Sequence, residues 1–235
     1  MSSGKFITLE GGEGAGKSTQ AKNLAAFLES YGIETILTRE VGGCPSAEEI
    51  RTLWLGKGEG HWDGLTEVLL ISAARREHLV KVIWPALEHG AWVISDRYMD
   101  STRAYQGVGL GLGIDLVDHY YKHIAGPPTL LRSFEGLSAQ SAEASGVGGK
   151  TFEPDLTLLL DLPVEAGMHR MNARAGQDDR YQQQKIAFHQ GLRDTYLELA
   201  EKYPERIKIV DASHSADAVF ADIQKIVQQH FALPK

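Results

Sequence analysis

The residues best suited to chemistry lie near the N-terminus, in a stretch rich in glycine. Residues 11–18 match the pattern G-x-x-x-x-G-K-[ST], in which the backbone N–H groups of a bent loop converge on a phosphate. The helix expected to follow adds the partial positive charge of its N-terminus at the same place. In this pattern Lys17 reaches the β- and γ-phosphates of a nucleoside triphosphate, and the Ser18 hydroxyl ligates Mg²⁺. The expected nucleotide-binding residues are Gly11, Gly12, Glu13, Gly14, Ala15, Gly16, Lys17, Ser18 and Thr19.

A second candidate group is Asp96-Arg97, which follows the apolar run that ends at Ser95. An aspartate that leaves a buried strand beside the phosphate loop can hold metal-bound water, and Arg97 can bind an anion. The alternative interpretation is an ion pair at the surface end of the strand. The guanine-specific tetrapeptide N-K-x-D of GTPases does not occur.

The elements that must position these residues alternate along the chain. Short β-like runs are predicted at 6–9, 34–39, 91–95, 156–162 and 207–210, and helical patterns at 18–31, 65–88, 114–124, 181–203 and 216–231. This alternation predicts an α/β fold with a mostly parallel sheet covered by helices on both faces. Residues 133–150 contain eleven Ser, Ala or Gly among eighteen residues, and we expect a surface loop without a fold of its own.

The amino-acid composition and net charge exclude some classes of protein. The 235 residues are 43% hydrophobic, which suits one globular domain, and carry a net charge of −7. This negative net charge argues against binding to nucleic acid or to an anionic membrane through bulk charge. Neither a signal peptide nor an apolar run of about 18 residues is evident. The lone Cys44 cannot form an internal disulfide, and we expect a cytoplasmic protein.

Five segments together resemble one enzyme family. They read FITLEGGEGAGKSTQ (6–20), TREVGG (38–43), AARREHL (73–79), VISDRYMDSTRAYQG (93–107) and PDLTLLLDL (154–162). The chain resembles the thymidylate kinases, P-loop kinases that convert dTMP to dTDP with ATP, over nearly its whole length apart from 133–150. The resemblance implies one three-layer P-loop kinase domain with five parallel strands, both nucleotides at their carboxyl edge and a small lid at about 167–182. It also implies Mg²⁺ as cofactor and a homodimer.

The resemblance assigns roles to individual residues. Glu13 corresponds to the residue that reaches the acceptor sugar, Arg75 to the arginine that hydrogen-bonds the thymine edge, and Arg97 to the one that contacts the acceptor phosphate. The expected dTMP-binding residues are Glu13, Arg39, Glu40, Arg51, Ile71, Arg75, Arg97, Ser101, Thr102, Tyr105 and Gln106. The expected metal-site residues are Ser18 and, through water, Asp96.

The expected catalytic residues are Lys17, Arg97, Arg170 and Arg174. Since no arginine lies inside the phosphate loop, the chain resembles the bacterial branch of the family, whose lid supplies the cation. Arg170 and Arg174 are spaced to share one helix face, and we rank both ahead of Arg180. Each of these arginines could instead lie on a solvated helix face.

Two positions depart from the family pattern. Ile71 stands where many members have an aromatic residue that stacks on thymine, and Val41 replaces a proline. Cys44 is interpreted as a small, partly buried apolar residue. Two alternatives therefore stay open: another P-loop nucleotide or nucleoside kinase, and an ATP-binding switch that has lost phosphoryl transfer.

Overall fold

The computed structural model describes residues 4–56, 62–126, 151–172, 181 and 184–234. Its centre is a five-stranded parallel sheet in the order β2-β3-β1-β4-β5, which confirms the predicted α/β class. The strands are β1 (Phe6–Glu10), β2 (Thr35–Arg39), β3 (Trp92–Asp96), β4 (Leu156–Asp161) and β5 (Ile207–Asp211). Each lies within two residues of its predicted bounds, because a buried apolar run identifies a parallel strand locally.

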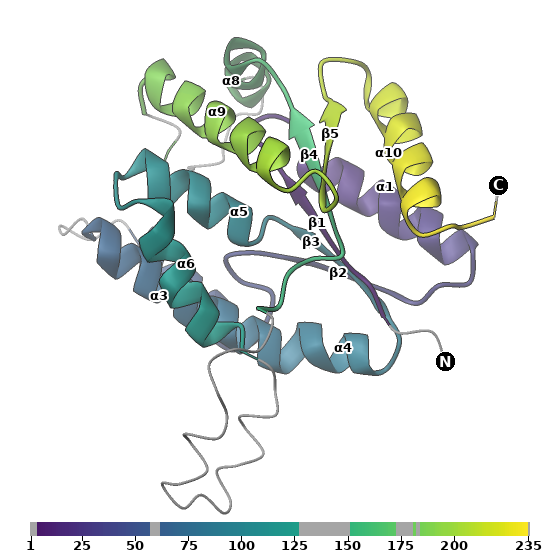
Figure 1. Ribbon diagram of the computed structural model, residues 1–235, viewed down its shortest axis with the longest axis horizontal. Helices are drawn as coiled ribbons and strands as arrows, with labels where there is room; N and C mark the ends of the chain where they lie inside the picture. The colour runs from purple at the N-terminus through teal and green to yellow at the C-terminus, as the bar shows by residue number, and fades with distance from the viewer. Residues whose placement is uncertain (1–3, 57–61, 127–150, 173–180, 182–183, 235) are drawn as a thin grey trace, which may run out of the picture.

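Helices α1 (Lys17–Ser30) and α10 (Ala216–His230) cover one face of the sheet, side by side in Figure 1. Alternate strand residues such as Ile7 and Leu158 pack against them in one apolar cluster. The α10 N-cap Ser215 accepts a hydrogen bond from the backbone N–H of Ala218, which fixes where this helix begins.

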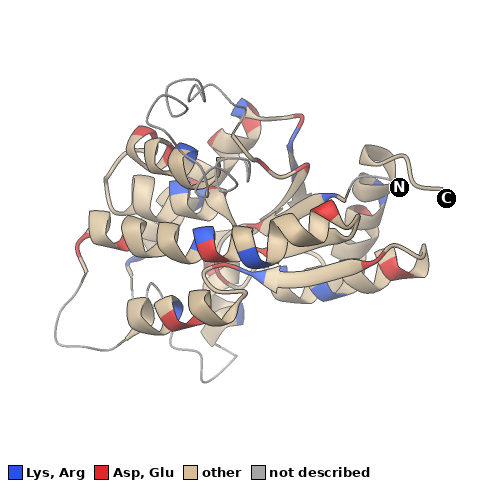
Figure 2. Cartoon of the chain, turned by 90° about the horizontal axis from the view of Figure 1, so that it is seen from below, with Lys and Arg blue, Asp and Glu red and all other residues tan. Residues whose placement is uncertain are grey.

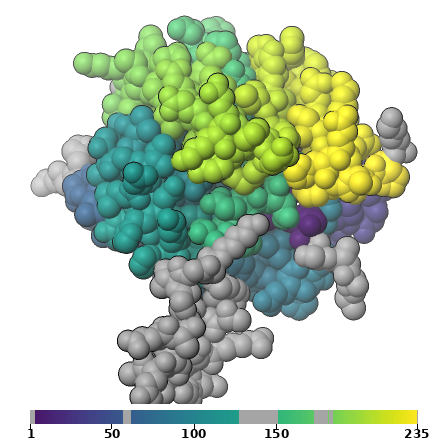
Figure 3. Space-filling model, viewed as in Figure 1, coloured from purple at the N-terminus to yellow at the C-terminus, as the bar shows by residue number. Residues whose placement is uncertain are grey.

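The opposite face is covered by a longer set of helices. These are α3 (Gly64–His78), the π-helical turn η1 (Leu79–Ile83), α4 (Trp84–Glu88), α5 (Met99–Thr102), the π-helical segment η2 (Arg103–Gly109), α6 (Ile114–Ile124) and α9 (Ile186–Lys202). Helix α2 (Pro45–Leu55) packs on α3, and α8 (Val164–Asn172) follows β4. Figure 3 shows the α6, α9 and α10 segments packed edge to edge on one surface.

The pattern at 65–88 left open one helix or two with Pro85 near the end, and the structure has two, α3 and α4, joined by η1. One helical prediction needed correction, and one helical stretch was missed. The last long helix before β5 begins at Ile186 rather than at 181. The helical stretch 99–109 was missed because it buries polar residues such as Asp100 and Arg103, which local patterning assigns to loops.

The described helices include none that combines the length and apolar character needed to cross a membrane. Figure 2 shows Lys and Arg interspersed with Asp and Glu along the chain. Cys44 is buried and packs with Ala47 and Ala74, which confirms its interpretation as a small apolar residue. The predicted loop at 133–150 lies outside the described residues, as does the expected lid except for 167–172 and 181.

Candidate active site

The phosphate loop joins β1 to α1. Gly16, just before α1, has φ of 93°, a left-handed conformation that glycine adopts readily. The ammonium of Lys17 donates to the carbonyl oxygens of Gly11 at 3.1 Å and Gly12 at 2.8 Å, and burial lowers its pKa. Lysine and helix N-terminus thus converge on one point, the arrangement that binds phosphate.

The loop passes very close to α8. Gly14 has φ of 71°, and a Cβ on it would lie 2.3 Å from the carbonyl oxygen of Gly167. A Cβ on Gly167 would in turn lie 2.5 Å from the carbonyl oxygen of Glu13. Both positions therefore require glycine, and α8 is held directly against the phosphate loop.

Ser18 and Asp96 supply two adjacent oxygens at the carboxyl end of β3. The Ser18 hydroxyl donates a hydrogen bond to the Asp96 carboxylate. Mg²⁺ prefers oxygen ligands and usually keeps several waters. The described residues contain no cluster of three or more His, Cys, Asp or Glu side chains that could hold a metal by themselves. The oxygens present fit a metal shared with nucleotide phosphates and water.

Arg97 connects the phosphate loop to the other half of the site. Its guanidinium donates to the Glu13 carboxylate at 2.5 Å, the Gly11 carbonyl at 3.2 Å and the Tyr105 hydroxyl at 3.1 Å. Burial alone would lower the pKa of Arg97, but Tyr105 and Glu13 raise it well above its ordinary value. Arg97 therefore remains a fixed positive charge.

Glu10 lies behind Arg97 and is fully buried. It accepts hydrogen bonds from the backbone N–H of Tyr98 at 2.8 Å and the Ser101 hydroxyl at 2.5 Å. Burial, and then the nearby charge of Asp100, raise the pKa of Glu10 to about 7. Its strand position alone did not mark Glu10 as a site-supporting residue.

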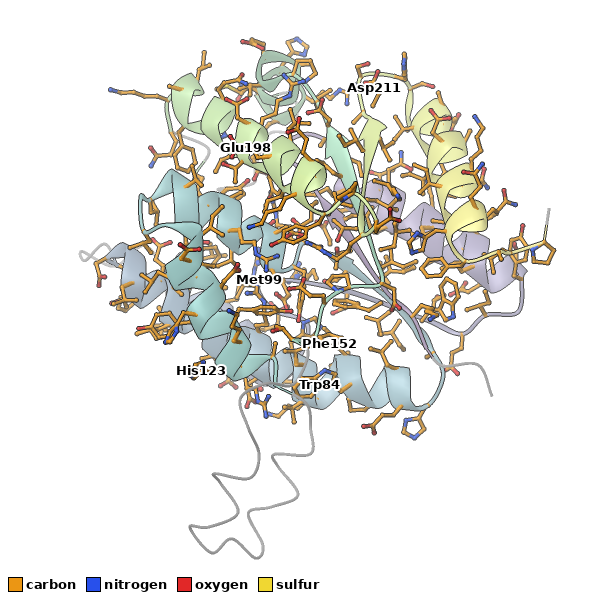
Figure 4. The ribbon with its side chains drawn as sticks, viewed as in Figure 1. Trp84, Met99, His123, Phe152, Glu198 and Asp211 are labelled. Carbon is orange, nitrogen blue, oxygen red and sulfur yellow. The ribbon has the colours of Figure 1, made fainter. Side chains whose placement is uncertain are left out.

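Arg75 is held in a buried ion pair on α3. Its Nε donates to the Glu40 carboxylate at 2.6 Å, and both side chains are 2% exposed. Its other guanidinium N–H groups donate to Met99 Sδ, the Tyr98 carbonyl oxygen and the Thr102 hydroxyl oxygen. Figure 4 labels Met99 deep inside the molecule. Burial would raise the pKa of Glu40, but Arg75 and the hydrogen bond with His78 hold it below its usual range.

Both halves of the site open into one cavity of about 450 Å³. All eleven expected dTMP-binding residues line it, together with Gly14, Gly16, Lys17, Ser18, Thr19 and Asp96. Of the other expected loop residues, Ala15 is buried in the core below α1, and Gly11 and Gly12 accept from Lys17 instead. The loop after β2 borders the cavity, and its Glu40–Val41 peptide bond is cis.

Sequence reasoning missed six lining residues, which are Val41, Trp54, Leu55, Tyr98, Met171 and Tyr181. Trp54 follows Arg51 by three residues on α2, so helical spacing could have found it. Tyr98 directly follows Arg97, and this adjacency to an expected site residue could have identified it. Tyr181 is brought to the cavity only by the tertiary structure.

Among the expected lid arginines, only Arg170 lies within the described residues. Arg170 donates to the carbonyl oxygens of Ala212 at 2.9 Å and Ser213 at 3.3 Å, in the loop after β5, and does not line the cavity. Its neighbour Met171 does line it. Arg174 and Arg180 lie outside the described residues. The catalytic role of these arginines stays a prediction.

A phosphate loop and an adjoining serine–aspartate oxygen pair share one cavity with a second, arginine-lined half on the same parallel sheet. These features define a P-loop kinase of the nucleotide kinase class. The family profile described as thymidylate kinase matches residues 9–132 and 137–223. The chain belongs to the thymidylate kinase family.

Individual relatives agree with this assignment. The thymidylate kinase of Caulobacter vibrioides is 42% identical over 233 residues, covering 99% of this chain and 100% of the relative. That of Bradyrhizobium sp. strain BTAi1 is 46% identical over 219 residues, covering 92% and 86%. The crystal structure of thymidylate kinase from Ehrlichia chaffeensis is similar with a TM-score of 0.69 and 31% identity, covering 97% of this chain and 100% of that one.

Proposed function

We propose that this protein transfers the γ-phosphoryl group of ATP to the phosphate of dTMP, giving dTDP for dTTP synthesis. The observation that carries the proposal is the single cavity, in which Arg97 contacts both the phosphate loop and the acceptor-side residue Tyr105. Membership of the thymidylate kinase family supports this choice of acceptor.

On the donor side, the phosphate loop binds the triphosphate of ATP. Lys17 leaves its loop carbonyls to contact the β- and γ-phosphates. Ser18 and, through water, Asp96 would hold Mg²⁺, which would neutralise phosphate charge. Lys17 then stabilises the negative charge that spreads over the transferring group.

On the acceptor side, Arg97 binds the phosphate of dTMP. A phosphate oxygen of dTMP attacks the γ-phosphorus, the bond to the β–γ bridging oxygen breaks, and ADP leaves. No general base is needed, because the attacking oxygen is already anionic at neutral pH. Arg75, Ile71 and Gln106 surround the base, and Glu13, next to Arg97, faces the sugar.

The deciding experiment measures ADP release from Mg·ATP with no acceptor, dTMP, dUMP, dCMP, CMP or thymidine. We expect release that depends on acceptor and is fastest with dTMP. Faster release with another acceptor would keep the kinase class but replace the substrate. ATP binding without acceptor-dependent release would favour the switch.

Lys17→Ala tests whether this cavity performs the transfer. We expect turnover to fall by about 10³-fold or more, because a cation at the transferring group contributes on that order. Lys22→Ala, an exposed position on the same helix, is the matched control and should keep normal turnover. Circular dichroism checks that both variants fold. Near-normal turnover of folded Lys17→Ala would sink the assignment.

We further propose a single P-loop kinase domain that forms a homodimer in the cytoplasm. All five described strands belong to one sheet, which supports a single domain. The buried, unpaired thiol of Cys44 suits a reducing compartment. The exposed Leu53 and Leu69, on the packed helices α2 and α3, supply apolar surface for a dimer. Sedimentation velocity at micromolar concentration tests this, and a monomer would contradict it.

A further inference from the structure

Glu67 is a buried carboxylate with no role in the transfer described above. It lies in the first turn of α3, is 2% exposed, and does not line the cavity. Ile71 and Arg75 follow at i+4 and i+8 on the same helix face, and both do line it. Glu67 therefore lies directly behind the acceptor pocket.

Three hydrogen bonds link Glu67 and two cavity residues, Gln106 and Tyr181. The Tyr181 hydroxyl donates to Glu67 Oε2 at 2.5 Å. Gln106 Nε2 donates to the same oxygen at 3.2 Å and to the Tyr181 hydroxyl oxygen at 2.9 Å. Gln106 and Tyr181 are 2% and 5% exposed, so these bonds are shielded from water. The Tyr181 ring stacks on Phe188 at 5.7 Å, which holds the hydroxyl in place.

These bonds fix which end of the Gln106 carboxamide faces the cavity. Glu67 Oε2 is the acceptor in both of its bonds, and the Tyr181 hydroxyl has already given its one proton to it. Both partners can therefore only accept from Gln106, which must turn its NH₂ group toward them. The reversed amide would place Oε1 against two oxygen acceptors and leave buried groups unpaired. No described residue donates to Gln106 Oε1, so this oxygen is available to a ligand.

At ring position N3, thymine and cytosine would meet this oxygen with opposite results. Thymine carries a hydrogen-bond donor at N3, whereas cytosine has a lone pair there and an amino group at C4. We propose that Glu67 is a positioning residue, which acts through Gln106 to present an acceptor to the base and so selects the thymine edge over the cytosine edge. This inference rests on the proposed function and names the group that sets its base selectivity.

The test is Glu67→Gln, a substitution of nearly equal size. Its carboxamide can donate as well as accept, so Gln106 is free to reverse. We expect the ratio of kcat/KM for dTMP to that for dCMP to fall by about tenfold or more, mainly through the KM values, since unpaired buried polar groups are a strong source of discrimination. The ratio for dTMP to dUMP should stay within about twofold, because uracil presents the same N3–H and O4 edge.

The two kcat/KM ratios distinguish a positioning role of Glu67 from a general loss of activity. A merely structural role for Glu67 would lower activity with all three acceptors together and leave both ratios unchanged, which would overturn the inference. Glu77→Gln, at a partly exposed position on the same helix, is the matched control and should leave both ratios at wild-type values. If wild-type protein does not use dTMP, the proposed function fails first and separately.

A second variant decides the matter if Glu67→Gln does not fold. Tyr181→Phe keeps the ring that packs on Phe188 but removes the hydroxyl that accepts from Gln106. We expect a smaller fall in the dTMP-to-dCMP ratio, by about threefold, with the dTMP-to-dUMP ratio unchanged. An unchanged dTMP-to-dCMP ratio in the folded variant would contradict the proposal.

Discussion

Single residues in this site are held by buried charges rather than by surface contacts. Glu40 was expected to bind dTMP, and it does line the cavity, but its carboxylate contacts Arg75 and His78. Arg75 therefore reaches the cavity as a guanidinium already fixed by a partner. Removing one member of such a pair leaves the other charge buried and uncompensated.

Glu40→Gln tests how much the ion pair between Glu40 and Arg75 contributes to stability. We expect the free energy of unfolding to fall by about 3 kcal/mol, because breaking a buried ion pair typically costs that much. The KM for dTMP should also rise as Arg75 loses its fixed position. Urea unfolding and steady-state kinetics measure the two effects. Glu48→Gln, which removes the exposed pair with Arg39, should cost less than about 1 kcal/mol. Equal losses in the two variants would contradict the argument.

Glu10 predicts a pH dependence of stability. Its pKa is raised from 4.5 to about 7, so the folded state holds this proton more tightly than the unfolded chain. The stability that Glu10 contributes is therefore full below pH 4.5 and is lost as the pH rises to about 7. The shift corresponds to a change of the order of 3 kcal/mol.

Glu10→Gln should remove this dependence. We expect the difference in free energy of unfolding between wild type and variant to change with pH between 5 and 7 and to be level above about pH 7.5, from urea titrations at each pH. Comparison with the variant cancels the similar contribution of Glu153, whose pKa burial also raises. Parallel curves across the whole range would refute the role of Glu10.

At the scale of elements, strand ends and helix starts bring the reacting groups together. Asp96 ends β3, Lys17 begins α1, and Glu40 follows β2. In a parallel sheet these ends share one edge, so residues far apart in sequence meet there. Helix α8 meets the same edge through Gly167 and Met171, but its Arg170 contacts the loop after β5 instead of the cavity.

This placement predicts unequal roles for the two leading arginines of the expected lid. Arg170→Ala should lower kcat by less than about tenfold, because the guanidinium is engaged by two carbonyl oxygens. Arg174→Ala should lower kcat by about 10³-fold, with little change in dTMP binding, as expected for a cation at the transferring group. Steady-state kinetics with dTMP titrations measure both. Equal losses of kcat would show that Arg170 itself reaches the phosphate.

At the scale of the whole molecule, a buried ionic cluster joins segments distant in sequence. Asp100 of α5 accepts from Arg103 of η2 at 2.7 Å and from Arg206, just before β5, at 2.6 Å. Arg103 also contacts Glu153, ahead of β4. Burial would raise the pKa of Asp100, but Arg206 and Arg103 hold it below its ordinary value. The cluster fastens the acceptor-side helices to the far half of the sheet.

Arg206→Met should therefore destabilise the fold with little effect on the chemistry. We expect the free energy of unfolding to fall by about 3–5 kcal/mol, since Asp100 would remain buried with one cation fewer. The value of kcat/KM for dTMP at 25 °C should stay within about threefold. Lys208→Met, at a partly exposed position on β5, should cost less than about 0.5 kcal/mol. A thermal melt equal to wild type for Arg206→Met would disprove the structural role.

The sequence by itself determined the phosphate loop, the positions of the five described strands and the α/β class. Glycine spacing, apolar runs and helix starts are local features, so a short window of residues is enough to identify them. Resemblance to a known family supplied the acceptor-side residues, all eleven of which line the same cavity. A division of 65–88 near Pro85 was one of two possibilities that the pattern left open. The helical stretch 99–109 could not be predicted in this way, because it buries polar residues whose partners lie far away in sequence.

Only the tertiary structure decided how the polar residues pair. Glu67 and Tyr181 are 114 residues apart, and Glu40 and Arg75 are 35 apart, yet each pair shares a hydrogen bond inside the protein. A side chain in sequence shows which groups it can donate or accept, but not which partner packing brings to it. Because a buried polar group must find a partner, the packing of distant elements determines these pairings and the orientation of the groups that line the cavity.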